Sequence, residues 1–349
     1  MKAERKQFAL LDVLKFVFIF IIMLSHTANE QAHLTGIWHY VLSLYNFGVP
    51  FCFACSGYLY FSKLQTLSET EQRDYYKKYS IRLGKMYLAW SIIYIAFTIV
   101  QWCIHGVTQE AVLARIHWWL VYTTYPTIWF VPALWVGVTM AFMIWKKWGW
   151  KPLFITASVF MVVGSAMGSY HNLLSAKWGG VIDYIYDGYI AAFDSFRNGV
   201  FNGFPFVVIG ALIAKKQNTM SLWVNLCLAV FFAVGVMAEC VMIKHFNYST
   251  VTDLAFLIAP AIYYLLSWAT KVEVKYNPAF LWMRNLSMIV FLSQRLFLTA
   301  IPSVSDVYSA WIGSMSQLQI MIVIPAMVMI FSWTVIVLTK RIPVLKVLW

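Results

Sequence analysis

The chain has 349 residues, of which 61% are hydrophobic, 18% aromatic and only 11% charged, and its mean hydropathy is +0.70. A soluble domain carries about 25% charged residues, so this composition excludes a soluble protein and predicts a polytopic membrane protein. In a soluble chain the net charge of +12 would suggest a nucleic-acid partner. In a membrane protein basic residues orient the helices instead, and no nucleic acid is expected.

Apolar runs of about 17 to 25 residues, enough to cross a bilayer, recur along the whole sequence. They predict an all-α helical bundle with about ten transmembrane helices. No hydrophilic domain or repeat interrupts them, so residues 1–349 are expected to form a single integral membrane domain. The predicted spans are residues 8–26, 37–61, 84–104, 126–145, 152–170, 199–214, 220–243, 252–270, 285–302 and 318–339.

The distribution of basic residues predicts the orientation. If the N-terminus is cytoplasmic, twenty of the 26 Lys and Arg residues fall in cytoplasmic segments and four in outer segments. Cytoplasmic loops carry such an excess of Lys and Arg. Both termini are therefore expected in the cytoplasm.

The first span contains three ionisable residues, Asp12, Lys15 and His26. Each costs roughly 2.5 to 3.5 kcal/mol in hydrocarbon, so such residues usually face a protein interior or a watery cavity. Lys15 and His26 are 11 residues apart, about 16 Å along one helix face. The alternatives are an interfacial Asp12–Lys15 ion pair with Lys15 reaching the headgroups, and a His26 exposed at a helix end.

A cleaved signal peptide also begins with basic residues and an apolar core. Here Asp12 and Lys15 interrupt that core and "SHTANEQA" is a poor cleavage site, so an uncleaved helix is expected. Cys52 and Cys55 form a CxxC inside the second span, where packing is expected rather than redox chemistry. No zinc-ligand spacing occurs, so no metal site is expected.

The next spans contain small and basic residues. Ala54, Ser56 and Gly57 allow close helix approach in the second span. Arg82 and Lys85 belong to a basic cluster at the inner entrance of the third span. Three roles are open for that cluster: it binds anionic lipid, it only sets the topology, or it binds a phosphate-rich cytoplasmic ligand.

The later spans add further polar residues. Arg197 and Asn198 precede a sixth span rich in Gly and Pro, which fits a polar cavity wall or a topological arginine. Arg295 lies within the ninth span, where an arginine needs a partner. Glu239 and Asp253 lie near outer ends and are expected at the interface.

These stretches, in this order, resemble the membrane acyltransferase-3 family, bacterial enzymes that acylate surface polysaccharides. The matching stretches are "LDVLKFVFIFIIMLSHT", "GVPFCFACSGYLY", "KKYSIRLGKMYLAWSIIY", "IWFVPALW" and "FRNGVFNGFPFVVIGALI". Three departures stand out. Lys15 replaces an arginine of the family, Lys85 replaces the second of two paired arginines, and Gln294 replaces a late histidine.

The resemblance implies transfer of an acyl group, commonly acetyl, from cytoplasmic acyl-CoA to a hydroxyl of a cell-surface glycan or its lipid-linked precursor. It also implies a multi-pass protein of the bacterial inner membrane, surrounded by lipid. Acetyl-CoA or another acyl-CoA is then a co-substrate, and no permanently bound cofactor is expected.

The resemblance also implies roles for named residues. His26 is the expected catalytic base, because histidine transfers protons near neutral pH, and Asp12 and Lys15 are expected to share its site. Cationic groups are needed for the CoA phosphates, and donors for the developing oxyanion. The expected CoA-binding residues are Arg82 and Lys85, and the expected substrate-binding residues are Arg197, Asn198 and Arg295.

A transporter or flippase for an acyl donor, an amino acid or a glycan is the alternative. Intramembrane charges and helices broken by Gly and Pro fit that class as well. A sensor or scaffold is a third class, but no soluble domain supports it.

Overall fold

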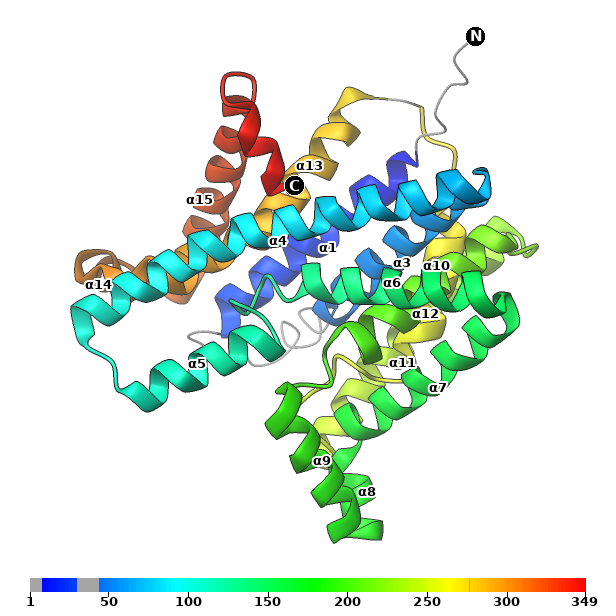
Figure 1. The fold of residues 1–349 in the computed structure, drawn as a ribbon, viewed down its shortest axis with the longest axis horizontal. Coiled ribbons are helices and arrows are strands. Elements are labelled where there is room, and N and C mark those ends of the chain that lie inside the picture. Colours follow the sequence, from blue (N-terminus) through cyan, green and yellow to red (C-terminus); the bar gives the residue numbers. More distant parts are fainter. Residues whose placement is uncertain (1–7, 30–43, 276) are drawn as a thin grey trace.

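The computed structural model describes residues 8–29, 44–275 and 277–349, and within these ranges it is helical without any strand (Figure 1). The long helices are α1 (Ala9–Asn29), α3 (Tyr45–Leu64), α4 (Glu69–His105), α6 (Phe130–Trp148), α7 (Trp150–Ser169), α11 (Leu222–His245), α13 (Pro278–Arg295) and α15 (Gln317–Leu338). The shorter ones are α5 (Gln109–Val121), α8 (His171–Trp178), α9 (Gly180–Phe193), α10 (Phe204–Lys215), α12 (Ile258–Ala269) and α14 (Asp306–Gly313). The short π-helical segments are η1 (Gly199–Gly203) and η2 (Leu296–Ala300), and the short 3₁₀-helical segments are η3 (Pro302–Val304) and η4 (Pro343–Leu348).

Within the described residues, seven helical segments are long and apolar enough to cross a membrane: Ala9–Ala28, Glu69–His105, Phe130–Trp148, Trp150–Ser169, Leu222–His245, Pro278–Val304 and Gln317–Leu338. The three other predicted spans coincide with α3 and with the shorter apolar segments Gly199–Lys215 and Ile258–Ala269. The predicted polytopic, all-α membrane protein is therefore confirmed. Residues 37–43 of the second predicted span lie outside the described residues.

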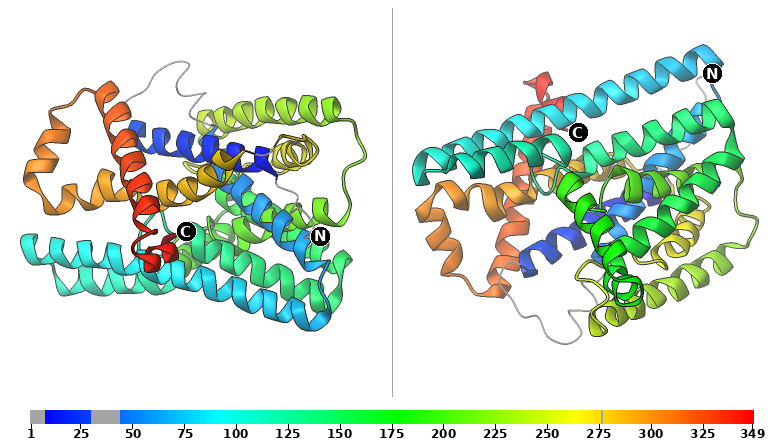
Figure 2. Two further views of the ribbon diagram at one scale, coloured as in Figure 1. Left: turned by 90° about the horizontal axis from the view of Figure 1, so that it is seen from above. Right: turned by 60° about the horizontal axis from the view of Figure 1, so that its bottom comes forward.

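Helix α4 is much longer than the span predicted at residues 84–104. Its 37 residues extend about 55 Å, whereas the hydrocarbon core of a bilayer is about 30 Å thick. Both views of Figure 2 show it as the long cyan helix at one edge of the molecule. The additional turns carry charged residues, which lower the hydropathy without weakening the helix, because Lys, Arg and Glu are good helix formers.

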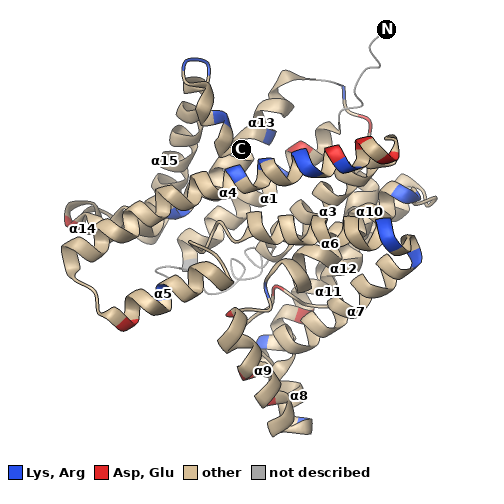
Figure 3. Cartoon of the chain, in the orientation of Figure 1, with Lys and Arg blue, Asp and Glu red and all other residues tan. Residues whose placement is uncertain are grey.

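Lys and Arg residues gather on one side of the molecule (Figure 3). They lie along the first half of α4, where α6 meets α7 and at the end of α10, whereas the far side with α8 and α9 carries acidic and basic residues together. This asymmetry is what the predicted orientation requires, with the basic side in the cytoplasm. The location of the termini stays a prediction.

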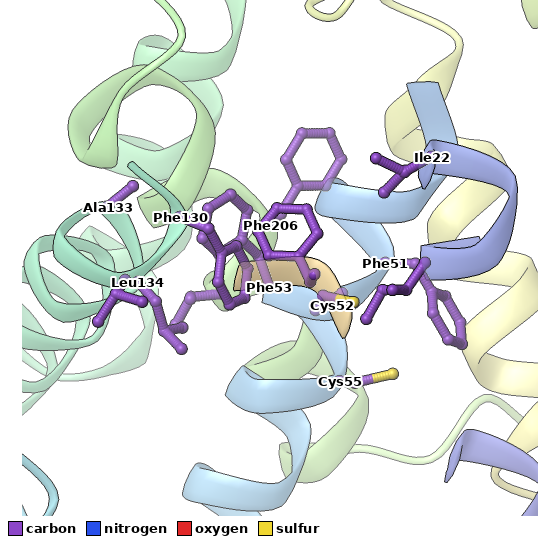
Figure 4. Close-up of a cluster of buried hydrophobic side chains, with 14 of the residues drawn as sticks. Ile22, Phe51, Cys52, Phe53, Cys55, Phe130, Ala133, Leu134 and Phe206 are labelled. Atoms are coloured by element: carbon purple, nitrogen blue, oxygen red, sulfur yellow. The ribbon is translucent and has the colours of Figure 1, made fainter. Parts of the chain in front are cut away.

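Close helix packing holds the centre together. A Cβ atom added to Gly57 would collide with the backbone of Val207, and one added to Gly210 with the backbone of Ala54. These two glycines let α3 and α10 touch backbone to backbone, as the small residues of the second span predict. On another side of α3, the ring of Phe53 stacks on Phe130 at 4.8 Å between centroids (Figure 4).

The two cysteines of the CxxC are free and buried in this core. Helix α1 lies inside the bundle against α3, α13 and α15. Its side chains Leu11 and Met23 are 1% and 0% exposed. The ionisable residues of the first span are thereby carried into the protein interior.

Candidate active site

A basic cavity of about 1050 Å³ lies between α1, α3, α4, α13 and the chain that follows α15. Its basic lining residues are Lys15, Lys78, Arg82, Arg284, Lys340 and Lys346. Among the described residues, no Asp or Glu lines it. Such a concave surface of one charge concentrates anions, and Lys and Arg are the usual partners of phosphate groups.

Lys15 reaches this basic cavity from α1. Its Nζ is 3.1 Å from Oδ1 of Asp12, whose Oδ2 is 3.9 Å from Nε of Arg284. Asp12 does not itself line the cavity, but it contacts two cationic residues that do, Lys15 and Arg284. The Lys15 side chain is 15% exposed. It therefore faces the cavity, which differs from the alternative of a lysine extended to the headgroups.

The two predicted CoA-binding residues, Arg82 and Lys85, differ in their relation to the cavity. Arg82 lines the basic cavity, with its guanidinium 5.3 Å from the ring centroid of Tyr79. Tyr79 in turn packs edge-on against the buried ring of Tyr60, 5.1 Å away. Lys85, three residues later, is exposed and lies outside the lining. Of the two, only Arg82 is brought to the cavity.

A second, polar cavity of about 70 Å³ lies beyond the first. Its ionisable lining residues are His26, Tyr45, Arg197, Asp253 and Arg295. These come from α1, α3, the segment before η1, the segment before α12 and the end of α13. Three predicted site residues, His26, Arg197 and Arg295, thus meet in one small cavity although they are far apart in the chain.

His26 is oriented by Gln294, which is 0% exposed. The Gln294 amide donates from Nε2 to the carbonyl oxygen of Phe291 at 2.9 Å, and this turns its Oε1 toward His26. Nδ1 of His26 lies 3.0 Å from that oxygen. An amide oxygen only accepts, so the hydrogen-bond network assigns the proton to Nδ1 and leaves Nε2 as the basic nitrogen.

Arg197 and Asp253 form an ion pair at the polar cavity, with Nη1 2.6 Å from Oδ2. The guanidinium also lies over the ring of Trp129, 5.2 Å from its centroid. Burial opposes the charge, but Asp253 and Tyr122 outweigh it and raise the pKa of Arg197. Arg197 is thus a fixed cation, and Asp253 is a site residue that the sequence placed at the membrane interface.

Asn198 does not line either cavity. Its Oδ1 accepts from the backbone N–H groups of Val200 and Phe201, at 2.9 and 3.1 Å, and so caps η1. Its Nδ2 donates to the carbonyl oxygen of Ser195 at 2.8 Å. Asn198 therefore fixes the turn that positions Arg197, since the loose N–H groups of a helix start need such acceptors.

Two buried amides in the polar cavity were not singled out from the sequence. Oδ1 of Asn46 and Oδ1 of Asn202 have no hydrogen-bond partner within the described part of the chain, and these residues are 3% and 1% exposed. Asn46 is held by its Nδ2, which donates to Oγ1 of Thr252 at 3.1 Å. Buried acceptors without partners are costly, so this cavity suits a ligand that donates hydrogen bonds.

The two cavities lie end to end. Among the residues that the structure describes, they share three lining residues: Ile22 of α1, Val49 of α3 and Phe291 of α13. The arrangement brings a large anion-binding space next to a small space with a basic histidine nitrogen, two guanidinium groups and unsatisfied acceptors. Chemically it can hold a phosphate-rich molecule on one side and deprotonate a small polar group on the other.

The profile of an acyltransferase domain matches residues 8–339, nearly the whole chain and all the residues of both cavities except Lys340, Lys346 and Trp349. The chain belongs to the acyltransferase-3 family. Family membership supports a membrane acyltransferase, as the order of the sequence motifs predicted.

Distant relatives carry the names of racemases. Two amino-acid racemases of Enterococcus faecalis are 22% and 21% identical over 271 and 272 residues, which is 76% of this chain and 37% and 36% of theirs. A serine/alanine racemase of Enterococcus gallinarum is 22% identical over 225 residues, 64% of this chain and 31% of its own. The match covers about a third of the length of each of these relatives. No solved structure matches it.

Within the acyltransferase-3 family, the departure at Gln294 has a structural explanation. Gln294 supplies the acceptor that a histidine ring nitrogen could also supply to Nδ1 of His26. Lys15 in place of arginine keeps one charge on the basic cavity and one contact to Asp12. It gives up the bidentate contacts of a guanidinium.

Proposed function

We propose that the protein transfers an acyl group from acyl-CoA to a hydroxyl of a cell-surface glycan or of its lipid-linked precursor. One observation carries this proposal: the basic cavity and the polar cavity lie end to end, with His26 just beyond their junction. The phosphates of CoA fit the six basic side chains of the first cavity. A neutral hydroxyl that donates a hydrogen bond fits the second, because Asn46 and Asn202 offer unsatisfied acceptors there.

In the reaction, Nε2 of His26 accepts the hydroxyl proton while the acceptor oxygen attacks the carbonyl carbon of the thioester. A carbon–oxygen bond forms, and the carbonyl electrons move onto oxygen. Arg295 lines the same cavity and brings a positive charge to this oxyanion. When the carbonyl re-forms, the carbon–sulfur bond breaks, and the CoA sulfur takes the proton from His26. The products are the ester and CoA, and His26 is again neutral.

The proposed roles follow the two cavities. Lys15 and Arg82 hold the CoA phosphates, with Asp12 positioning Lys15. Arg197, fixed by Asp253, binds the acceptor. In the predicted orientation the basic cavity opens toward the cytoplasm, where acyl-CoA is made. We place the protein in the cytoplasmic membrane of a bacterium, since the relatives named above are bacterial.

The test uses membrane vesicles that contain the protein and their own acceptors, supplied with acetyl-labelled acetyl-CoA. The proposal predicts release of CoA thiol together with label in the glycan or lipid-linked fraction. Vesicles without the protein are the control. Label that stays on CoA, at the control rate, would contradict the proposal.

An amino-acid transporter is the second candidate, because the compared relatives are named for reactions of amino acids. Two cavities separated by a constriction also fit a transport site. The same vesicles distinguish the candidates: a transporter accumulates labelled serine or alanine and releases no CoA thiol.

A further inference from the structure

We propose that Ile22, Val49 and Phe291 form an acyl collar, an apolar ring that limits the acyl group passed from the basic cavity to the polar cavity to short chains. This inference rests on the proposed function, because it names the residues that select the donor for that reaction. In the described part of the chain, these are the three residues that line both cavities.

Along α1, the residues that line the basic cavity give way at Ile22 to those that line the polar cavity. Lys15, Ile19 and Ile22 line the basic cavity, and Ile22 and His26 line the polar cavity. These four residues follow the three- and four-residue spacing of one helix face. His26 is one turn, about 6 Å, beyond Ile22, so a group that passes Ile22 arrives beside the proposed base.

Helices α3 and α13 likewise line the polar cavity with one part and the basic cavity with another. On α3, which begins at the polar end, Asn46 and Pro50 line the polar cavity, Val49 lines both cavities and Cys52 lines the basic one. On α13, Met288 lines the basic cavity, Phe291 lines both cavities and Arg295 lines the polar one. Each of these three helices thus contributes one apolar residue that lines both cavities.

Packing keeps the collar narrow. Ile22 and Phe291 are 3% and 5% exposed. The ring of Phe291 meets Phe130 edge-on at 5.5 Å, and Phe130 stacks on Phe53 (Figure 4). On the other side, Ile22 presses against Gly48, where an added Cβ would collide with its side chain. These contacts leave the side chains of Ile22 and Phe291 little freedom to move aside.

The sizes of the cavities point to the same limit. The basic cavity of about 1050 Å³ holds a large donor, but only about 70 Å³ remains beyond the collar. An apolar protein cavity of about 150 Å³ admits one benzene ring. About half that space holds an acetyl group beside the reacting hydroxyl, and a chain of six carbons does not fit.

The test compares acetyl-, butyryl- and hexanoyl-CoA as donors in the vesicle assay. Phe291→Ala removes a ring from the collar and is expected to raise the butyryl-to-acetyl rate ratio by about tenfold or more, because one methylene in an apolar pocket changes specificity by about 10- to 200-fold. Val49→Ala and Phe291→Leu are milder variants that decide the question if Phe291→Ala does not accumulate. Val49→Phe is expected to close the passage and lower transfer from every donor.

Phe51→Ala is the matched control. Phe51 is also a buried phenylalanine of α3, 0% exposed, but it lines neither cavity and points away from Phe53 and Phe130 (Figure 4). The butyryl-to-acetyl rate ratio of Phe51→Ala is expected to equal that of the unchanged protein. The collar is refuted if acetyl transfer occurs but the ratio stays constant in the collar variants, or rises equally in Phe51→Ala. Absence of acetyl transfer from the unchanged protein contradicts the proposed function instead.

Discussion

Replacement of Gln294 by leucine tests how the proposed base is oriented. Leucine has a similar size but cannot accept the hydrogen bond that Gln294 receives from Nδ1 of His26 at 3.0 Å. A buried donor left without a partner costs about 1 to 3 kcal/mol. The loss destabilises the reactive tautomer of His26, in which Nδ1 carries the proton. We therefore expect kcat to decrease about 5- to 150-fold, since each 1.36 kcal/mol is a factor of ten in rate.

The assay is the initial rate of label transfer from acetyl-CoA, measured at several donor concentrations. The decrease is expected in kcat, with KM for acetyl-CoA nearly unchanged, because Gln294 does not line the basic cavity. Gln294→His is expected to recover part of the rate through a ring nitrogen. Gln72→Leu is the matched control, a buried glutamine outside both linings. An unchanged kcat in well-folded Gln294→Leu protein would refute this role.

Three further comparisons between variants test the basic cavity and the packing. Arg82→Ala is expected to raise KM for acetyl-CoA at least tenfold, because a charge-assisted contact is worth about 1.5 to 3 kcal/mol, whereas Lys85→Ala leaves KM nearly unchanged; equal effects would contradict the geometry. Lys15→Arg is expected to retain more activity than Lys15→Ala in the same assay, since charge on the cavity wall is the requirement. Gly210→Ala is expected to destabilise the protein by about 1 to 3 kcal/mol through overpacking against the α3 backbone, measured by thermal unfolding in detergent. Gly188→Ala, where an added Cβ meets nothing, is its control.

The helical membrane fold could be predicted from the sequence because each span can be recognised from its own stretch of residues. Length and hydropathy identify a span without knowledge of its neighbours. The same holds for the face shared by Lys15 and His26, which depends only on helical spacing. The length of α4 was missed because its charged first half continues the helix after hydropathy has fallen.

The partners within the site could not be predicted in this way. Asp253 belongs beside Arg197 only because segments 56 residues apart meet at the polar cavity. Asn198 and Asn202 occur in one motif, yet the first caps a helical turn and the second faces the cavity. Helix rotation and packing decide such differences, and neither is encoded in a single stretch of sequence.

The most direct test of the central claim compares His26→Ala with His117→Ala in the acetyl-CoA vesicle assay. His26 lines the polar cavity, whereas His117 is an exposed histidine on α5. With both proteins present in the membrane in equal amounts, the proposal predicts loss of label transfer by at least about 100-fold for His26→Ala, the usual contribution of a general base. His117→Ala is expected to transfer at the normal rate. Undiminished transfer by His26→Ala would contradict the assignment of His26 as the base.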